Sequence, residues 1–326
     1  MNEKTVRKPL YQIALTICLG FIIISCSSKQ EPFSSAGETW GIYQQDLDKG
    51  DMRLIFGGSG EIIGLSLDPT GTQLVFSQKV GGEDNQFSEI FLYSLIDKTI
   101  TRLTENDHWD LYPVWSPDGS EIAFLSWRDA TLDIYLMDKD GANQKLLYDS
   151  GYHDADIDWT GTKIVFTQQS QIWIMDSDGS NAEPLTDPPR AGEWGQANLP
   201  FGDYDPRLSP DGSEVVFSRM IGDESVHGNY DIFRVNVDGS DLLNLTGTGY
   251  SQGLSNWSHE GNELLYIIAA VEEKGIYDLF TMNRDGSEKT LRTEENTPPD
   301  FLVHWACYST DPGSVYLVGQ WWIEDS

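Results

Sequence analysis

The chain has 326 residues, and 52 Asp and Glu against 21 Lys and Arg give it a formal net charge of −31. Negative charge on this scale repels phosphate backbones and anionic headgroups, so it excludes nucleic acids and anionic lipid surfaces as partners. It favours cations, basic partners or neutral ligands.

The first 25 residues have the pattern of a bacterial lipoprotein signal peptide. Lys4, Arg7 and Lys8 precede an apolar run over 10–24, and a small residue and Cys26 follow it. This order resembles a lipobox, so we expect cleavage before Cys26 and lipid on that cysteine, with residues 26–37 as a polar tether. An ordinary cleaved signal with a chance cysteine is the alternative.

Later in the chain no apolar run is long enough to span a bilayer, so we expect membrane contact only through the lipid anchor. This predicts a place in the bacterial cell envelope, anchored in the outer membrane and facing the periplasm or the cell surface. Removal of residues 1–25 would leave a formal charge of −33. Cys18 would leave with the signal, and Cys307 would remain as a small buried hydrophobe without a disulfide partner.

Six copies of one β-hairpin pattern fill the rest of the chain. They are Leu65–Ser77, Val114–Ser126, Ile157–Thr167, Arg207–Ser218, Asn256–Ile267 and His304–Val318. Their turn glycines lie 42 to 52 residues apart, and short strands repeated at this period are typical of a β-propeller with one blade per repeat. We therefore predict an all-β fold over residues 38–326, a six-bladed β-propeller of four-stranded antiparallel blades.

Each of these hairpins supplies the two inner strands of a blade, and a second hairpin supplies the outer two. Five outer hairpins follow inner ones: Glu89–Thr104, Asp133–Tyr148, Gln171–Thr186, Asp231–Thr246 and Asp278–Thr293. The sixth is at the other end of the chain, at Thr39–Phe56. The last blade should therefore combine C-terminal inner strands with N-terminal outer strands, which closes the ring and protects its edges.

One repeat carries a family resemblance. Pro113 to Phe124 reads Pro-x-Trp-Ser-Pro-Asp-Gly-x-x-Ile-Ala-Phe, and Ile134 to Gly141 reads Ile-Tyr-x-Met-Asp-x-Asp-Gly. This pattern resembles the TolB-type propeller repeat. The resemblance implies an envelope propeller that docks other molecules at one mouth of its channel, as TolB does with a peptidoglycan-associated lipoprotein. Two features differ: TolB has an α/β domain where this chain has a short tether, and TolB is not lipidated.

The predicted topology gives the ring two different faces. Tight Pro-Asp-Gly and Asp-x-Asp-Gly turns lie on one, the turn face. Loops between second and third strands, and the crossings between blades, lie on the other, the loop face. The long irregular segments all belong to the loop face: Gln78–Ser88, Asp187–Asp205, Arg219–Tyr230 and Ala269–Tyr277. Because long loops in compact domains usually carry function, we predict the binding site on the loop face.

Alignment of the blades suggests which side chains form that site. Aligned on Trp115, Trp159, Leu208, Trp257 and Trp305, the blades place Asp110, Asp154, Asp203 and Asp300 at one position, where each innermost strand begins. Asp156 and Asp205 lie two residues further on. With His108, His153, Trp109, Tyr112, Trp127 and Trp194, they are expected to form an acidic, aromatic channel mouth. Local turn capping by each Asp is the alternative, and the repeated tryptophans are expected to pack between blades.

Such a mouth suits a cation, a basic side chain or a sugar. Its oxygen-rich composition suits Ca²⁺ or another divalent cation, although the sequence defines no ligand set and no certain cofactor. The sequence contains no Gly-x-Ser-x-Gly, His-Glu-x-x-His or phosphate-binding glycine motif. We therefore predict a non-catalytic, monomeric scaffold that docks an envelope protein. The alternative is a metal-dependent glycan-binding or oligosaccharide-lyase propeller, because certain pectin-oligomer lyases resemble this fold.

Overall fold

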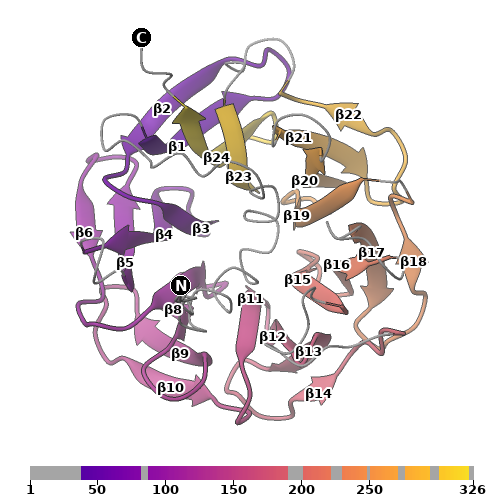
Figure 1. The fold of residues 1–326 in the computed structure, drawn as a ribbon, viewed down its shortest axis with the longest axis horizontal. Helices are drawn as coiled ribbons and strands as arrows, with labels where there is room; N and C mark the ends of the chain where they lie inside the picture. The colour runs from indigo at the N-terminus through magenta and orange to yellow at the C-terminus, as the bar shows by residue number, and fades with distance from the viewer. Residues whose placement is uncertain are drawn as a thin grey trace, which may run out of the picture.

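The computed structural model describes residues 38–81, 87–189, 201–221, 230–247, 250–270, 276–293 and 301–322. Within these ranges the strands β1 to β24 form six antiparallel sheets of four strands, and there is no helix. The sheets stand around a central axis as the blades of a ring (Figure 1). The predicted six-bladed propeller is confirmed. Accordingly, the described part of the chain has no helix that is long and apolar enough to cross a membrane.

The blades are numbered 1 to 6 in the chain order of their innermost strands. The innermost strands are β3 (Ile62–Leu67), β7 (Asp110–Trp115), β11 (Asp154–Thr160), β15 (Asp203–Leu208), β19 (Ser251–Trp257) and β23 (Phe301–Tyr308). The second strands are β4 (Gln73–Val80), β8 (Glu121–Ser126), β12 (Lys163–Gln168), β16 (Glu214–Met220), β20 (Glu263–Ala270) and β24 (Ser314–Trp322). The third strands are β5 (Phe87–Ser94), β9 (Asp133–Asp138), β13 (Gln171–Asp176), β17 (Tyr230–Asn236), β21 (Ile276–Asn283) and β1 (Glu38–Asp46). The outermost strands are β6 (Ile100–Arg102), β10 (Lys145–Tyr148), β14 (Glu183–Pro184), β18 (Leu243–Asn244), β22 (Thr290–Leu291) and β2 (Met52–Gly57).

The two ends of the chain close the ring in blade 6, as predicted. Strand β1 lies between β24 and β2, and it pairs with β24 over its whole length, from Glu38 opposite Trp322 to Asp46 opposite Ser314. Figure 1 shows this indigo strand beside the yellow β24. The ladder gives hydrogen-bond partners to backbone groups that would otherwise form an open sheet edge.

The second strands carry the largest fully buried side chains of the core. One position in blades 1 to 5 holds a fully buried aromatic ring: Phe76, Phe124, Phe166, Phe217 and Tyr266. Both faces of these strands are buried, as in β8, because each blade packs between two neighbours. This explains why the inner hairpins read as nearly continuous apolar runs rather than as strict alternations.

Serine and glycine stabilise the inner hairpin turns. In the turn from Ser116 to Gly119, the Ser116 hydroxyl accepts hydrogen bonds from the amides of Ser120 at 3.1 Å and Glu121 at 2.9 Å. Gly119 has a φ of +70°, a conformation in which a side chain would be strained. Ser116 and Gly119 therefore serve the conformation of the turn itself.

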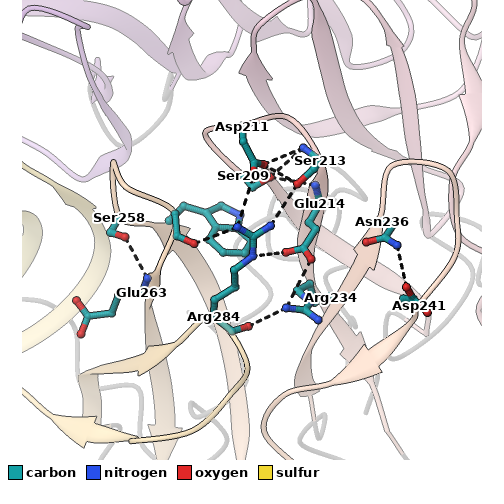
Figure 2. Close-up of polar contacts among 12 residues, drawn as sticks. Ser209, Asp211, Ser213, Glu214, Arg234, Asn236, Asp241, Ser258, Glu263 and Arg284 are labelled. Carbon is teal, nitrogen blue, oxygen red and sulfur yellow. Dashed lines mark hydrogen bonds and ion pairs between the residues drawn. The ribbon is translucent and has the colours of Figure 1, made fainter.

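Arg284 ties blade 5 to blade 4 on the turn face. Its Nε donates to Glu214 Oε2 at 2.8 Å and its Nη2 to Ser213 Oγ at 3.2 Å (Figure 2). Its guanidinium also lies 5.5 Å from the centre of the Trp257 ring. Glu214 is nearly buried, so its paired guanidinium offsets the cost of removing the carboxylate from water.

The closure of the ring can be tested with two residues of blade 6. Ile42 of β1 is fully buried opposite Val318, whereas Leu54 of β2 is 55% exposed. Ile42→Ala leaves a cavity in the closing sheet and is expected to lower the free energy of unfolding by about 2–5 kcal/mol. Leu54→Ala should change it by no more than about 0.5 kcal/mol. Urea unfolding followed by circular dichroism measures both, and equal effects would contradict a closing role for β1.

Candidate functional site

A β-bulge interrupts the innermost strand at the same level in blades 1 to 5. The residues there have φ between +50° and +69°: Gly64, Tyr112, Asp156, Asp205 and Leu254. A bulge adds a residue and re-aims the side chains that follow it. The pairing with the second strand shifts by one residue at the bulge. The side chains that follow the bulge therefore point in a different direction relative to the channel.

A cavity of about 410 Å³ occupies the channel from the level of the bulges to the turn face. It is called the turn-side cavity below, and residues of all six innermost strands line it. Its aromatic wall consists of Tyr112, Trp115, Trp159, Trp257, Trp305 and Tyr308. A cavity of this volume is within the usual range for small-molecule sites.

Charged side chains of blades 3 and 4 lie against this cavity. Asp156 and Asp158 line it together with Arg207, and Asp205 is close behind, its amide 3.5 Å from Asp156 Oδ2. Asp158 Oδ2 accepts a hydrogen bond from the Leu208 amide at 2.8 Å, which joins the two blades. Burial raises the pKa of Asp156, Asp158 and Asp205, because a single guanidinium does not offset the desolvation of three carboxylates.

Arg207 crosses the channel toward blade 6. Its guanidinium lies 5.0 Å from the centre of the Trp305 ring, and its Nη1 donates to the Pro206 carbonyl at 2.6 Å. The Tyr112 ring is 5.7 Å from the same indole. Side chains of blades 2, 4 and 6 therefore meet in one layer inside the channel.

The alignment of blade 6 on Trp305 is wrong by three residues. Tyr308 pairs with Val315, as Trp115 pairs with Ile122, so Tyr308 holds the position that the other blades fill with Trp or Leu. Trp305 takes the channel position of Tyr112, and from there it still packs against the core shared by blades 1 and 6 and donates its indole N–H to the Leu65 carbonyl at 3.1 Å. By the same register Val303, and not Asp300, is equivalent to Asp110. Blade 6 should be aligned with the other blades on its inner turn, Ser309–Gly313, and not on its nearest tryptophan.

Trp115 and Trp257 are buried, and both pack between blades as predicted. Trp115 contacts the core side chains of blade 1, and Trp257 those of blade 4. The Trp257 indole N–H donates to the Arg207 carbonyl at 3.1 Å. These two rings thus serve both the interblade core and the wall of the turn-side cavity.

The strand register confirms the shared position of Asp110, Asp154 and Asp203, the first residues of β7, β11 and β15. All three side chains are fully buried and bonded locally. Asp110 accepts from Ser126 Oγ at 2.5 Å and pairs with Arg128 at 3.0 Å.

The other two carboxylates of this position have equally local contacts. Asp203 accepts two hydrogen bonds from Arg219, at 2.6 and 2.7 Å, and Asp154 accepts from Ser150 Oγ at 2.8 Å. Such contacts favour the local structural role of these carboxylates, and their role in binding stays a prediction.

Several of the predicted aromatic residues gather on the loop face of blades 2 and 3. The Trp127 amide donates to the Trp109 carbonyl at 2.9 Å, and the Trp127 ring meets the edge of His153 with centroids 4.8 Å apart. His108 precedes Trp109 in the sequence and is 43% exposed, and Tyr152 precedes His153 and is 53% exposed. These five residues are called the loop-face patch.

His153 is fixed within this patch. Its Nδ1 accepts a hydrogen bond from the Leu132 amide at 3.0 Å, and partial burial lowers its pKa. Lys79 of blade 1 reaches the patch with its Nζ 5.9 Å from the centre of the Trp109 ring. The sequence did not single out Lys79 or Tyr152, because neither occupies a repeated position.

Comparison with known proteins places this architecture in a family. The profile of the TolB β-propeller domain matches residues 33–223, more than half of the chain. The chain belongs to the TolB β-propeller domain family.

Individual members of this family are similar to different extents. An uncharacterized protein of Agrobacterium fabrum is 32% identical over 215 residues, which cover 62% of this chain and 68% of that protein. The Tol-Pal system protein TolB of Anaeromyxobacter dehalogenans is 25% identical over 122 residues, 37% of this chain and only 27% of that protein. The solved structure of TolB from Acinetobacter baumannii superposes with a TM-score of 0.61 at 18% identity, over 82% of this chain and 66% of that one. At this identity the superposition establishes the fold alone.

Several predicted features of this TolB-family propeller lie outside the described residues: the signal peptide, the tether with the proposed lipidation site Cys26, Trp194, Asp300 and much of the long loops (82–86, 190–200, 222–229 and 271–275). In the described ranges, no group of three or more His, Cys, Asp or Glu side chains is arranged to hold a metal ion. His304 is buried at 3.1 Å from Gln320 Oε1 and packs on Trp40, with ring centroids 4.5 Å apart. A divalent cation at the channel mouth therefore gains no support from these side chains.

Asp154 should make a contribution to the stability of this TolB-family propeller that falls as pH rises. Burial raises the pKa of this carboxyl to about 7. Between the ordinary value and about 7, the folded state keeps a proton that the unfolded chain has lost, so stability falls as pH rises through this window.

Asp154→Asn mimics the protonated side chain and should remove this contribution. The variant is expected to match the wild type near pH 4 and to exceed it at pH 8, by about 1.4 kcal/mol for each tenfold change in proton affinity. Urea unfolding of both proteins across this range gives the difference directly. A difference that does not vary with pH would show that folding leaves the pKa of Asp154 unchanged.

Proposed function

We propose that this chain is a non-catalytic, lipid-anchored propeller of the bacterial envelope that docks a protein partner through its loop-face patch. The observation that carries the proposal is the gathering of partly exposed aromatic rings from two blades at one place on this face. Membership of the TolB β-propeller domain family supports it, since one relative is named as a protein of the Tol-Pal system.

The loop-face patch has the physical character of an interface anchor. Trp109 and Trp127 pack from outside against the core of blades 2 and 3, which holds their rings in place before any partner arrives. Rigid aromatic side chains lose little conformational entropy on binding and carry much of the energy of protein interfaces. The exposed His108 and Tyr152 add polar groups at the rim of the patch.

The position of the tether supports a partner close to the membrane. Glu38 begins β1 opposite Trp322, at the far end of the sheet from the turn at Ser314, and so on the loop face. The twelve residues from Ser27 to Glu38 cannot reach further than about 40 Å even when fully extended. An anchor at Cys26 would therefore keep the loop face within that distance of the bilayer.

The proposed lipid anchor is tested by Cys26→Ser. Without a thiol for the acyl chains, the chain should lose incorporated labelled palmitate and leave the membrane fraction, because the anchor is its proposed membrane attachment. Metabolic labelling and fractionation of cells producing the full chain measure both effects. A Cys26→Ser protein that stays with the membrane would contradict the anchor and leave docking through the patch as a separate question.

The docking proposal is tested by capture of partners from detergent-solubilised envelope with the full chain, in the presence and absence of a chelator. One protein should be retained with the wild type in both conditions. Replacement of the two exposed rim residues, His108→Ala with Tyr152→Ala, should weaken binding of the purified partner roughly tenfold. Trp109→Ala should weaken it further, and its unfolding temperature shows whether the fold is intact.

Ile96→Ala is the matched control, because Ile96 is 71% exposed in the turn between β5 and β6, on the turn face. It should bind the partner as the wild type does. If partner binding survives all patch substitutions, or if Ile96→Ala weakens it as much as they do, the loop-face patch is not the docking surface.

A further inference from the structure

The turn-side cavity is a second site, on the other side of the ring from the loop-face patch. Its lining reaches turn residues such as Pro117, Pro210 and Ser258, and its inner end is the layer of Tyr112, Arg207 and Trp305. At about 410 Å³ it has the volume of roughly a dozen water molecules, which suits a small molecule rather than a folded domain.

One wall of the cavity carries carboxyl groups. Asp156 and Asp158 line it from blade 3, and the buried Asp205 stands behind them. Arg207 is the cationic side chain among the described lining residues, so carboxylates outnumber it. Burial raises the pKa of these carboxyl groups, so on their own they favour the protonated form, and a cation placed beside them would favour the ionised form.

The remaining walls suit an organic cation. Indole rings of Trp115, Trp159, Trp257 and Trp305 line the cavity, and an indole face attracts ammonium and guanidinium groups. Arg207 already makes both kinds of contact inside the channel. Its guanidinium lies 5.0 Å from the centre of the Trp305 ring and is attracted by Asp156 and Asp158.

A metal ion fits these residues poorly. Calcium takes six to eight oxygen ligands, and the described residues offer no group of three His, Cys, Asp or Glu placed to hold an ion. One oxygen of Asp158 is already bonded to the Leu208 amide. A large hydrophobic wall also contributes nothing to the coordination of an inorganic ion, whereas it contributes directly to binding of an alkyl ammonium or guanidinium.

We propose that the turn-side cavity binds a small organic cation, a molecule that carries a primary ammonium or guanidinium group on an apolar stem. The charged group lies at the wall formed by Asp156 and Asp158, and the stem packs on the indole rings. This proposal goes beyond protein docking and does not depend on it, because the residues that carry it are absent from the loop-face patch.

The test uses the full chain and four probes with short alkyl stems: n-butylguanidinium, n-butylammonium, n-butanol and butyrate. Ligand-observed NMR gives affinities, and the unfolding temperature gives an independent measure, since a ligand that binds only the folded state raises it. Both cations should bind saturably and roughly tenfold more tightly than butyrate or butanol. Equal binding of all four probes, or no saturable binding of either cation, would overturn the proposal.

Two neutral substitutions locate the site. Asp158→Asn removes the charge but keeps an oxygen that can accept from the Leu208 amide, and Asp156→Asn suits the φ of +52° at that position. Each should weaken binding of n-butylguanidinium roughly tenfold. Asp178→Asn, at an exposed turn of the same blade, is the matched control and should leave binding unchanged.

Calcium provides the remaining comparison. Calcium chloride should displace n-butylguanidinium no better than an equal ionic strength of potassium chloride. Displacement specific to calcium would overturn the proposal in favour of a metal site. Unchanged binding in both Asp→Asn variants, with their unfolding temperatures near that of the wild type, would place the cations elsewhere on this acidic protein.

Discussion

The pairing of β1 with β24 is the interaction on which the rest of the structure depends. It joins residues 268 to 284 positions apart and turns six blades with two open ends into a closed ring. The innermost strands can then face one another across a common channel, and side chains of blades 2, 4 and 6 can meet there. An open ring would leave β24 with an unpaired edge and would let blades 1 and 6 separate.

Within the closed ring, the bulges determine which side chains line the channel. At one level of blades 1 to 5 the backbone takes a left-handed conformation, which glycine accepts freely and aspartate accepts better than most residues. Gly64, Asp156 and Asp205 fit this requirement, whereas Tyr112 and Leu254 adopt it at a cost of about 1–2 kcal/mol each. The folded ring sustains that cost, and the channel gains its charged and aromatic lining.

The two faces of the ring have different chemistry for topological reasons. The turn face is built from short turns in which Ser and Asp side chains satisfy the backbone, and Arg284 joins neighbouring blades there. The loop face receives the crossings between blades, where Trp109, Trp127 and His153 gather without a repeat to fix them. A propeller can therefore keep one face constant for stability and vary the other for recognition. The channel runs through the centre of the ring between the two faces. A second site, independent of the loop-face patch, can therefore form in the channel.

The sequence by itself determined the class of fold, the number of blades and the closure, because hairpin period, turn residues and the unpaired outer hairpin at Thr39–Phe56 are local signals. It also placed Asp110, Asp154 and Asp203 at one position, since the strand register follows from the distance to the turn. Only the tertiary structure decided that these carboxylates are bonded within their own blades, while Asp156, Asp158 and Arg207 line a cavity with Trp305. Those contacts join separate blades and depend on bulges, and no spacing along one strand encodes which side chains meet across the ring.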